Sequence, residues 1–236
     1  MNRIQIIQTL LDRIVGKTYL EIGSQNGDSF FKICAKRKLA VDPKFKIPTI
    51  YRMRRTFSKM IRLEEERYFE MTSDDFFLYK SNLFRKNKID IALIDGLHTY
   101  KQSLRDVLSC LGHLSENGVI VIHDCNPQSE AMAYPSSSLQ DAERLKLPGW
   151  AGYWCGDVWK TIVYLRSSRS DLNVFVLDCD FGVGLVARGK QEKLLGYSLG
   201  EIEHISYHEF ESQRTRLLNL RPDDYLQEFL ASLYFV

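Results

Sequence analysis

The sequence predicts an α/β protein with a mainly parallel sheet and helices on both of its faces. Apolar segments of strand length alternate with longer segments of helix length between residues 18 and 123. Acidic residues follow the ends of several of these strands, as at Asp42, Asp95 and Asp124. The length of 236 residues, with 44% hydrophobic and 26% charged residues, suits a single large domain over 1–236.

The first half of the chain supplies most of the expected sheet. We expect strands at 18–22, 38–41, 67–71, 89–94 and 119–123. The helices between them are expected from about Asp28, over 50–66, from a Ser73–Asp74 cap to Asn82, and over 100–113. Asn117–Gly118 is expected to form a turn before the strand at 119–123.

The alternation stops after residue 124. Residues 125–156 contain proline, glycine and a serine run together with Trp150, Tyr153 and Trp154, and we expect a lid or a binding loop there. A helix is expected over 157–167. Strands at 173–178 and 183–187, with a short connection, predict a hairpin and therefore one antiparallel strand. Residues 190–236 are expected to form a helical extension, with a helix start at Pro222–Asp224.

Charge and composition exclude several classes of protein. A net charge of +2 gives no reason to expect nucleic acid as a partner. The basic run Lys44–Arg62 is interpreted as a solvated helix face in preference to an anionic-substrate contact. Five cysteines without paired spacing favour free thiols in a reducing compartment. Since no signal peptide or apolar span is found, we expect a cytoplasmic protein without a membrane partner.

The turn after the first strand indicates a nucleotide-type ligand. Gly23 and Gly27 let the backbone approach a ligand closely, and Ser24 lies between them. A dinucleotide fingerprint needs a glycine where Gln25 stands, so the turn suits a ligand without phosphates at this point. Asp42, after the next strand, is placed to bind a ribose diol, and Glu21 to hold an ammonium group. Together these features describe S-adenosylmethionine better than NAD.

A second group of polar residues follows two later strands. Asp95 ends the strand at 89–94 and His98 comes three residues later, while His123 and Asp124 end the strand at 119–123. Strand ends in an open parallel sheet border the crevice that binds ligands, so we expect a reaction site with a divalent cation.

The motifs E-I-G-x-x-x-G, V-D-P and I-D-G-x-H-x-Y, and a strand ending in H-D, resemble class I S-adenosylmethionine-dependent methyltransferases. The resemblance covers residues 15–125 and is greatest to the macrocin-O-methyltransferase-like group, whose members often methylate sugar hydroxyls. It implies a Rossmann-like methyltransferase sheet of seven strands, the last antiparallel, and dependence on Mg²⁺. It also implies Asp95 and Asp124 as metal ligands and His98 as the base that removes a proton from the acceptor.

Several alternatives stay open at this point. His123 stands where the group often has an acid, so it favours Mn²⁺ or Zn²⁺, or no ligation at all. Asp95 is interpreted either as a cofactor contact or as a cap of the next helix. Ser73 is either an adenine contact or an N-cap. Asp157 is either an N-cap or a substrate contact. Trp150, Tyr153 and Trp154 either stack on an acceptor or anchor their loop.

The acceptor is not fixed by the sequence. We predict a saccharide or a glycosylated hydroxyl, with a phenolic or catechol-like small molecule as the alternative. From other classes, a nicotinamide-dependent oxidoreductase is disfavoured by Gln25, and a non-catalytic cofactor-binding module by the acids that converge with His98. The sequence leaves homo-oligomerisation open.

Overall fold

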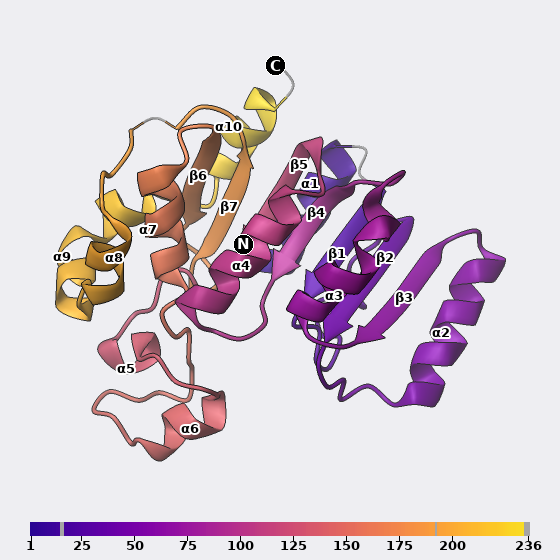
Figure 1. The fold of residues 1–236 in the computed structure, drawn as a ribbon, viewed down its shortest axis with the longest axis horizontal. Helices are drawn as coiled ribbons and strands as arrows, with labels where there is room; N and C mark the ends of the chain where they lie inside the picture. Colours follow the sequence, from indigo (N-terminus) through magenta and orange to yellow (C-terminus); the bar gives the residue numbers. More distant parts are fainter. Residues whose placement is uncertain (15–16, 192, 234–236) are drawn as a thin grey trace. The chain divides into compact units, whose positions relative to one another are not determined.

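The computed structural model describes residues 1–14, 17–191 and 193–233. The chain divides into two compact units (Figure 1). The N-terminal unit comprises residues 3–96 and 105–121, and the C-terminal unit comprises residues 1–2, 97–104 and 122–236.

The N-terminal unit contains the strands predicted in the first half of the chain, hydrogen-bonded in the order β3-β2-β1-β4-β5. Their bounds are β1 (Thr18–Ile22), β2 (Arg37–Asp42), β3 (Glu65–Glu70), β4 (Ile89–Ile94) and β5 (Leu114–Ile122), the last of which ends at the boundary with the C-terminal unit. β1 pairs in parallel with both β2 and β4, and β2 pairs in parallel with β3. The carboxyl ends of these strands therefore meet at one edge of the sheet.

Among the described residues of this unit, the helical elements are α1 (Arg3–Arg13), α2 (Thr49–Ile61), α3 (Ser73–Lys80) and the 3-10 helix η1 (Ser81–Phe84). A fifth helix, α4 (Tyr100–Leu111), begins in the C-terminal unit and ends in this one. α1 packs against β4 and buries Ile6, Ile7, Leu10 and Leu11, the apolar stripe of an amphipathic helix.

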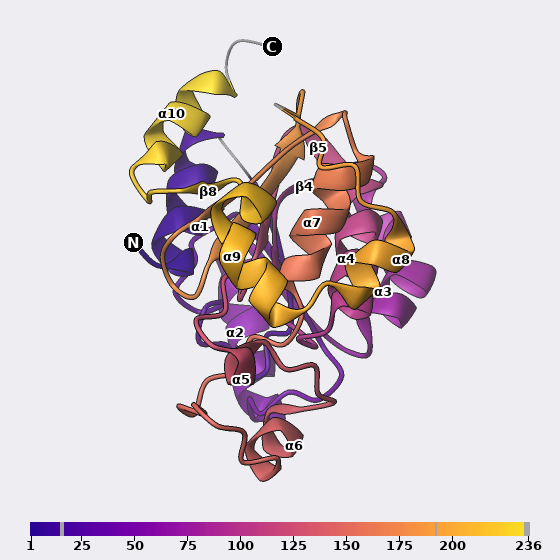
Figure 2. The same cartoon turned by 90° about the vertical axis from the view of Figure 1, so that its left-hand side faces the viewer.

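The C-terminal unit contains the predicted hairpin. β6 (Leu172–Leu177) pairs antiparallel with β7 (Val183–Arg188), and the short strand β8 (Leu220–Arg221) pairs in parallel with β6. Its other helices are α5 (Glu130–Ala133), α6 (Leu139–Arg144), α7 (Trp159–Ser168), α8 (Leu199–His204), α9 (Tyr207–Leu218) and α10 (Tyr225–Ser232). Figure 2 shows α7 with α8 and α9 packed beside it.

These strands confirm the predicted fold class, an α/β protein with a Rossmann-like, mostly parallel sheet and one antiparallel strand near its end. β8 was not predicted, because two residues are too few to show a strand period. In the described part of the extension predicted over 190–236, three helices are present, but residues 193–198 are not helical and β8 separates α9 from α10. α10 starts directly after the expected Pro222–Asp224.

The helix expected from about Asp28 is wrong: residues 28–32 form only turns. The backbone N–H of Cys34 donates to the side chain of Gln8 at 2.8 Å, and the ammonium of Lys38 donates to the carbonyls of Phe30 and Ile33. A continuing helix would need the Phe30 carbonyl and the Cys34 N–H for each other. The buried side chain of Lys38 thus replaces the helical bonds.

Two boundaries also differ from the prediction. α2 ends at Ile61 rather than at residue 66, because Leu63 adopts a left-handed conformation (φ 57°) and β3 starts at Glu65. Asn117–Gly118 lies inside β5 and is not a turn. A Cβ atom at Gly118 would lie 2.9 Å from the carbonyl oxygen of Ile89, so the glycine serves close packing between neighbouring strands.

Candidate active site

The bend after β1 is built so that only glycine fits at its first position. Gly23 has φ 91°, and a Cβ atom there would lie 2.1 Å from the carbonyl oxygen of Asp95 and 2.5 Å from the Cα atom of Gly96. Gly27, at the other end of the bend, has φ 80°. The bend therefore carries little side-chain bulk, as a ligand that contacts the backbone requires.

Asp42 closes this bend from the end of β2. One of its carboxylate oxygens accepts from the backbone N–H of Gln25 at 2.9 Å, and the other accepts from that of Lys44 at 2.8 Å. Each carboxylate oxygen has two lone pairs, so both retain capacity for a hydroxyl donor. The predicted ribose-binding acid is thus buried and held in a fixed orientation.

Glu21 is buried beneath the bend and accepts a hydrogen bond from the phenol of Tyr19. Burial raises the pKa of Glu21 to about 7, and the nearby negative charge of Asp95 adds to this shift. At neutral pH the carboxyl group therefore exists as a mixture of charged and neutral forms. A cation placed beside it would favour the charged form.

The other predicted cofactor residues occupy different positions. Ser24 is buried in the bend, where its hydroxyl donates to the carbonyl of Glu21 at 3.4 Å. Asp95 follows β4 and its carboxylate lies 3.3 Å from Nε of Arg3. Ser73 begins α3, but the N-cap is Thr72, whose hydroxyl accepts from the N–H of Asp75. The prediction that Ser73 and Asp74 cap this helix is wrong.

His98, in the C-terminal unit, is held by Trp154. The ring atom Nδ1 lies 2.8 Å from the carbonyl oxygen of Trp154, and the two rings are stacked with centroids 5.1 Å apart. A hydrogen bond to a carbonyl requires a proton on Nδ1, which leaves Nε2 as the basic nitrogen. A Cβ atom at Gly156 would lie 1.8 Å from the carbonyl oxygen of His98, so this contact also needs glycine.

Asp124 lies between two imidazoles. Its Oδ2 atom is 3.4 Å from Nδ1 of His98 and 3.1 Å from Nδ1 of His123, and its Oδ1 atom is 3.4 Å from Sγ of Cys155. The residue is buried and has φ 61°, a left-handed conformation that aspartate, asparagine and glycine adopt more readily than other residues.

Sequence reasoning missed Asp180. Its carboxylate lies 3.6 Å from Nε2 of His123, so that His123 faces Asp124 with one ring nitrogen and Asp180 with the other. Asp180 belongs to the β6–β7 loop, which the backbone N–H groups of Cys125 and Asn126 hold through the carbonyls of Gly182 and Phe181. An acid in a short hairpin loop at a strand's carboxyl end was the available signal.

The segment 125–156 contains two short helices, and Trp154 anchors it. The indole N–H of Trp154 donates to the carbonyl of Tyr134 at 2.8 Å and its ring is buried. Tyr153, by contrast, is exposed and its ring lies 5.0 Å from that of Phe181. Trp154 thus fits the interpretation as an anchor.

Asp157 does not cap the helix that follows it. The cap position of α7 is Val158, and Asp157 instead accepts a hydrogen bond of 2.6 Å from the backbone N–H of Tyr100. It therefore binds the first N–H of α4, an alternative that the sequence did not suggest.

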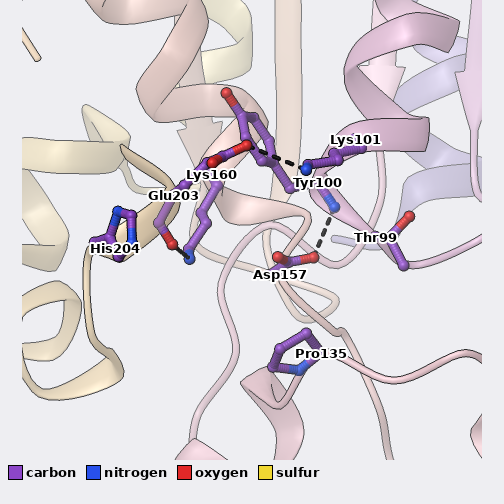
Figure 3. A pocket seen from close by; sticks show the side chains of 8 residues that line it. All are labelled: Thr99, Tyr100, Lys101, Pro135, Asp157, Lys160, Glu203 and His204. Carbon is purple, nitrogen blue, oxygen red and sulfur yellow. Dashed lines mark hydrogen bonds and ion pairs between the residues drawn. The ribbon is translucent and has the colours of Figure 1, made fainter. Parts of the chain in front are cut away.

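A hollow of about 510 Å³ opens next to this contact (Figure 3). It is lined by Thr99, Tyr100, Lys101, Pro135, Asp157, Lys160, Glu203 and His204. The buried ammonium of Lys160 donates to the carbonyl of Glu203 at 2.8 Å, while the carboxylate of Glu203 lies 3.3 Å from Lys101. Within the described part of the chain, the buried hydroxyl of Tyr100 has no hydrogen-bond partner.

Comparison with known proteins places the chain among methyltransferase folds. Residues 20–125 match the family model described as a methyltransferase domain, which confirms the predicted enzyme class. No curated protein sequence matches the chain. The matched segment contains the bend, Asp42, Asp95, His98 and Asp124. The finer assignment to the macrocin-O-methyltransferase-like group is not established by this match.

Solved structures show the same fold at low sequence identity. A proposed O-methyltransferase of Klebsiella pneumoniae is similar with a TM-score of 0.55 and 13% identity, over 79% of this chain and 80% of that one. A methyltransferase of Podospora anserina bound to SAH is similar with a TM-score of 0.52 and 18% identity, over 79% of this chain and 77% of that one. For a proposed caffeoyl-CoA O-methyltransferase of Staphylococcus aureus the TM-score is 0.50 and the identity 15%, over 79% of this chain and 82% of that one.

No helix in the described residues is both long and apolar enough to cross a membrane.

Proposed function

We propose that the protein transfers a methyl group from S-adenosylmethionine to a hydroxyl oxygen. The observation that carries this proposal is the bend Gly23–Gly27, which has room only for backbone at Gly23 and is closed by Asp42. Asp42 is assigned to the ribose hydroxyls and Glu21 to the cationic end of the cofactor. The SAH bound by the Podospora anserina relative supports a ligand of this class.

His98 is assigned as the general base. Methyl transfer from a sulfonium needs a nucleophilic oxygen, and a sugar hydroxyl is weakly nucleophilic until its proton is removed. With Nδ1 bound to the carbonyl of Trp154, the Nε2 atom accepts the acceptor's proton. The imidazolium that results has the carboxylate of Asp124 within 3.4 Å, which stabilises the new positive charge.

The chemistry of the donor atoms around Asp124 fits a divalent cation. The buried carboxylate has imidazole nitrogens of two histidines nearby, and Asp180 lies against the far nitrogen of His123, as an orienting carboxylate does for a ligating histidine. We propose Asp95, Asp124 and His123 as the residues that would hold Mg²⁺ or Mn²⁺. A bound cation would stabilise negative charge on the acceptor oxygen.

The hollow beside Thr99 is proposed as the acceptor site, because it begins at the residue after His98. Two lysines and two carboxylates line it, so the charges balance and the lining offers both donors and acceptors. A neutral molecule with many hydroxyls suits such a lining, which supports a saccharide or glycosylated acceptor. The similarity to a proposed caffeoyl-CoA O-methyltransferase is the observation that favours the phenolic alternative.

Calorimetry with S-adenosylhomocysteine and with NADH tests the cofactor. We expect binding of S-adenosylhomocysteine alone, and its loss in Gly23→Ala; binding of NADH alone would contradict the proposal.

For the metal, turnover of an acceptor is measured after chelation and after return of Mg²⁺ or Mn²⁺. We expect restoration in the wild type and a raised metal requirement in Asp95→Asn. Full turnover in the chelated enzyme would restrict Asp124 to its role beside His98.

A further inference from the structure

Helix α2 faces the sheet with its charged side rather than its apolar side. None of its residues is buried, although it packs along β3 (Figure 1). The side chains turned toward the strand are Arg52, Arg55 and Lys59, which form ion pairs with Glu70, Glu66 and Glu64 respectively. This is the reverse of the usual arrangement, in which an amphipathic helix buries its apolar stripe.

The ionic face fixes the orientation of the helix. Arg55 binds both carboxylate oxygens of Glu66, at 2.7 and 2.9 Å, and the side chain of Glu66 is completely buried. Rolling the helix to hide its apolar side would leave this buried carboxylate without its guanidinium partner, which is strongly destabilising. The hydroxyl of Thr56 adds a bond of 2.9 Å to the carbonyl of Glu66.

A continuous apolar stripe consequently faces outward. At a helical period of 3.6 residues, positions 50, 53, 57, 60 and 61 share one face. Each carries a large apolar side chain exposed by 59% or more, and Leu63 just beyond the helix is 84% exposed; the set is Ile50, Met53, Phe57, Met60, Ile61 and Leu63. Contiguous exposed apolar surface of this kind marks an interaction site.

The stretch of chain that carries the stripe also carries unpaired positive charge. Residues 44–63 contain seven lysines and arginines and no acidic residue. Three of the seven form the ion pairs with Glu64, Glu66 and Glu70, of which Glu66 and Glu70 belong to β3 and Glu64 directly precedes it. The other four are exposed and form no ion pair with any residue that the structure describes; they are Lys44, Lys46, Arg54 and Arg62.

We propose that the outer face of α2 docks on the surface of an anionic lipid bilayer, lying in the interface without crossing it. An apolar face flanked by basic residues is the pattern of an interfacial helix, and anionic headgroups complement the four free charges. A coiled-coil partner would need only a narrow seam at 50, 53, 57 and 60, whereas Ile61 and Leu63 widen this face.

The proposal is independent of the reaction. It replaces two sequence-based expectations, that this basic run is only a solvated face and that the protein has no membrane partner. The first expectation rested on charge alone. The direction of the apolar side chains becomes visible only when the ion pairs to β3 are known.

Co-sedimentation of the full chain with vesicles tests the proposal. We expect binding to vesicles of equimolar phosphatidylcholine and phosphatidylglycerol, and much weaker binding to phosphatidylcholine alone. Phe57→Glu should weaken binding at least tenfold, and Arg54→Gln by roughly fivefold, the effect of one basic residue near an anionic surface. Leu78→Glu, at a position on α3 that is 68% exposed, is the matched control and should bind as the wild type does.

Circular dichroism shows whether each variant remains folded, so a loss of binding is not confused with unfolding. Failure of the folded wild type to bind either vesicle would overturn the proposal. Undiminished binding of Phe57→Glu would overturn it as well. Sedimentation velocity without lipid gives a third decisive outcome, because a dimer that Phe57→Glu dissociates would identify a second copy as the occupant.

Discussion

The proposed cofactor site and the proposed reaction site of this protein are built by different means. Around Gly23 the geometry is set by backbone: strand ends, left-handed glycines and N–H groups bound by Asp42. Around Asp124 it is set by side chains from segments far apart in the sequence, including His98, Trp154 and Asp180. The residues of the first site are recognisable from the local sequence as turn residues and strand ends, whereas the second site depends on side-chain contacts between distant segments.

The largest effect is expected for Gly23→Ala. The added methyl group would meet backbone atoms of Asp95 and Gly96 that have no room to move, and φ 91° is itself unfavourable for alanine. We expect loss of several kcal/mol of folding free energy, or loss of cofactor binding in any folded fraction. Gly149→Ala is the matched control, because Gly149 has φ 80° and open space around its Cα; denaturant unfolding separates the two. Equal losses of unfolding free energy in the two variants would show that the positive φ, and not the contact with Asp95 and Gly96, causes the destabilisation.

Asp124→Asn is expected to damage the reaction and spare the cofactor. Asparagine tolerates the left-handed backbone, so the fold is retained, but the imidazolium of His98 loses its nearby negative charge. We expect kcat to fall by roughly 10²- to 10⁴-fold, the usual contribution of acid–base catalysis. The affinity for S-adenosylhomocysteine should change little. His208→Gln, on an exposed histidine, is the control. A large loss of cofactor affinity in Asp124→Asn would mean that Asp124 contributes to cofactor binding as well as to the reaction.

Glu21 brings a pH dependence to the cofactor side. Its pKa is 4.5 in the unfolded chain and about 7 in the fold, so the folded state binds the proton more tightly. Stability from this group is complete below pH 4.5 and is lost as pH rises toward 7, by about 3 kcal/mol. Glu21→Gln should flatten this decline in urea unfolding at pH 5 and pH 8. An unchanged slope would contradict the assignment to Glu21.

The same shift predicts proton release when the cofactor binds. A cationic ligand beside Glu21 lowers its pKa, so binding of S-adenosylmethionine near pH 7 should release a fraction of a proton. Calorimetry in buffers of different ionisation enthalpy measures this quantity. The release should disappear in Glu21→Gln.

The smallest effect is expected for Trp154→Phe. Phenylalanine can still stack on His98, but the carbonyl of Tyr134 loses its indole donor. We expect a loss of roughly 1 kcal/mol in unfolding free energy, typical of one hydrogen bond. The effect on catalysis is measured as kcat. It should fall less than tenfold, because the carbonyl of residue 154 that binds His98 belongs to the backbone and is kept in the variant. A collapse of turnover would show that the indole itself positions the acceptor.

This contrast also explains what the sequence could reveal. β1, β2, β4 and the β6–β7 hairpin were predictable, because apolar runs and turn residues determine them locally. The glycine bend and Asp42 were predictable for the same reason. The failure at residues 28–32 arose from Lys38, a lysine that the pattern could not show to be buried.

On the reaction side, His98, His123 and Asp124 were visible as strand-end residues, but their partners were not. Asp180 comes from a loop more than fifty residues later in the chain, and backbone bonds from Cys125 and Asn126 help to hold that loop beside His123. Asp157 likewise binds α4 rather than its own helix. No local periodicity encodes either contact.

The β6–β7 loop has a practical consequence for protein engineering. Asp180, Phe181 and Gly182 are consecutive left-handed residues, and a Cβ atom at Gly182 would lie 2.4 Å from the backbone of Asn126. An insertion of even one residue would move the carboxylate of Asp180 off its histidine, so this hairpin is a poor place for a tag or a graft. The turn at Gly149 and Gly152, which has open space around both residues, is the better choice for such a modification.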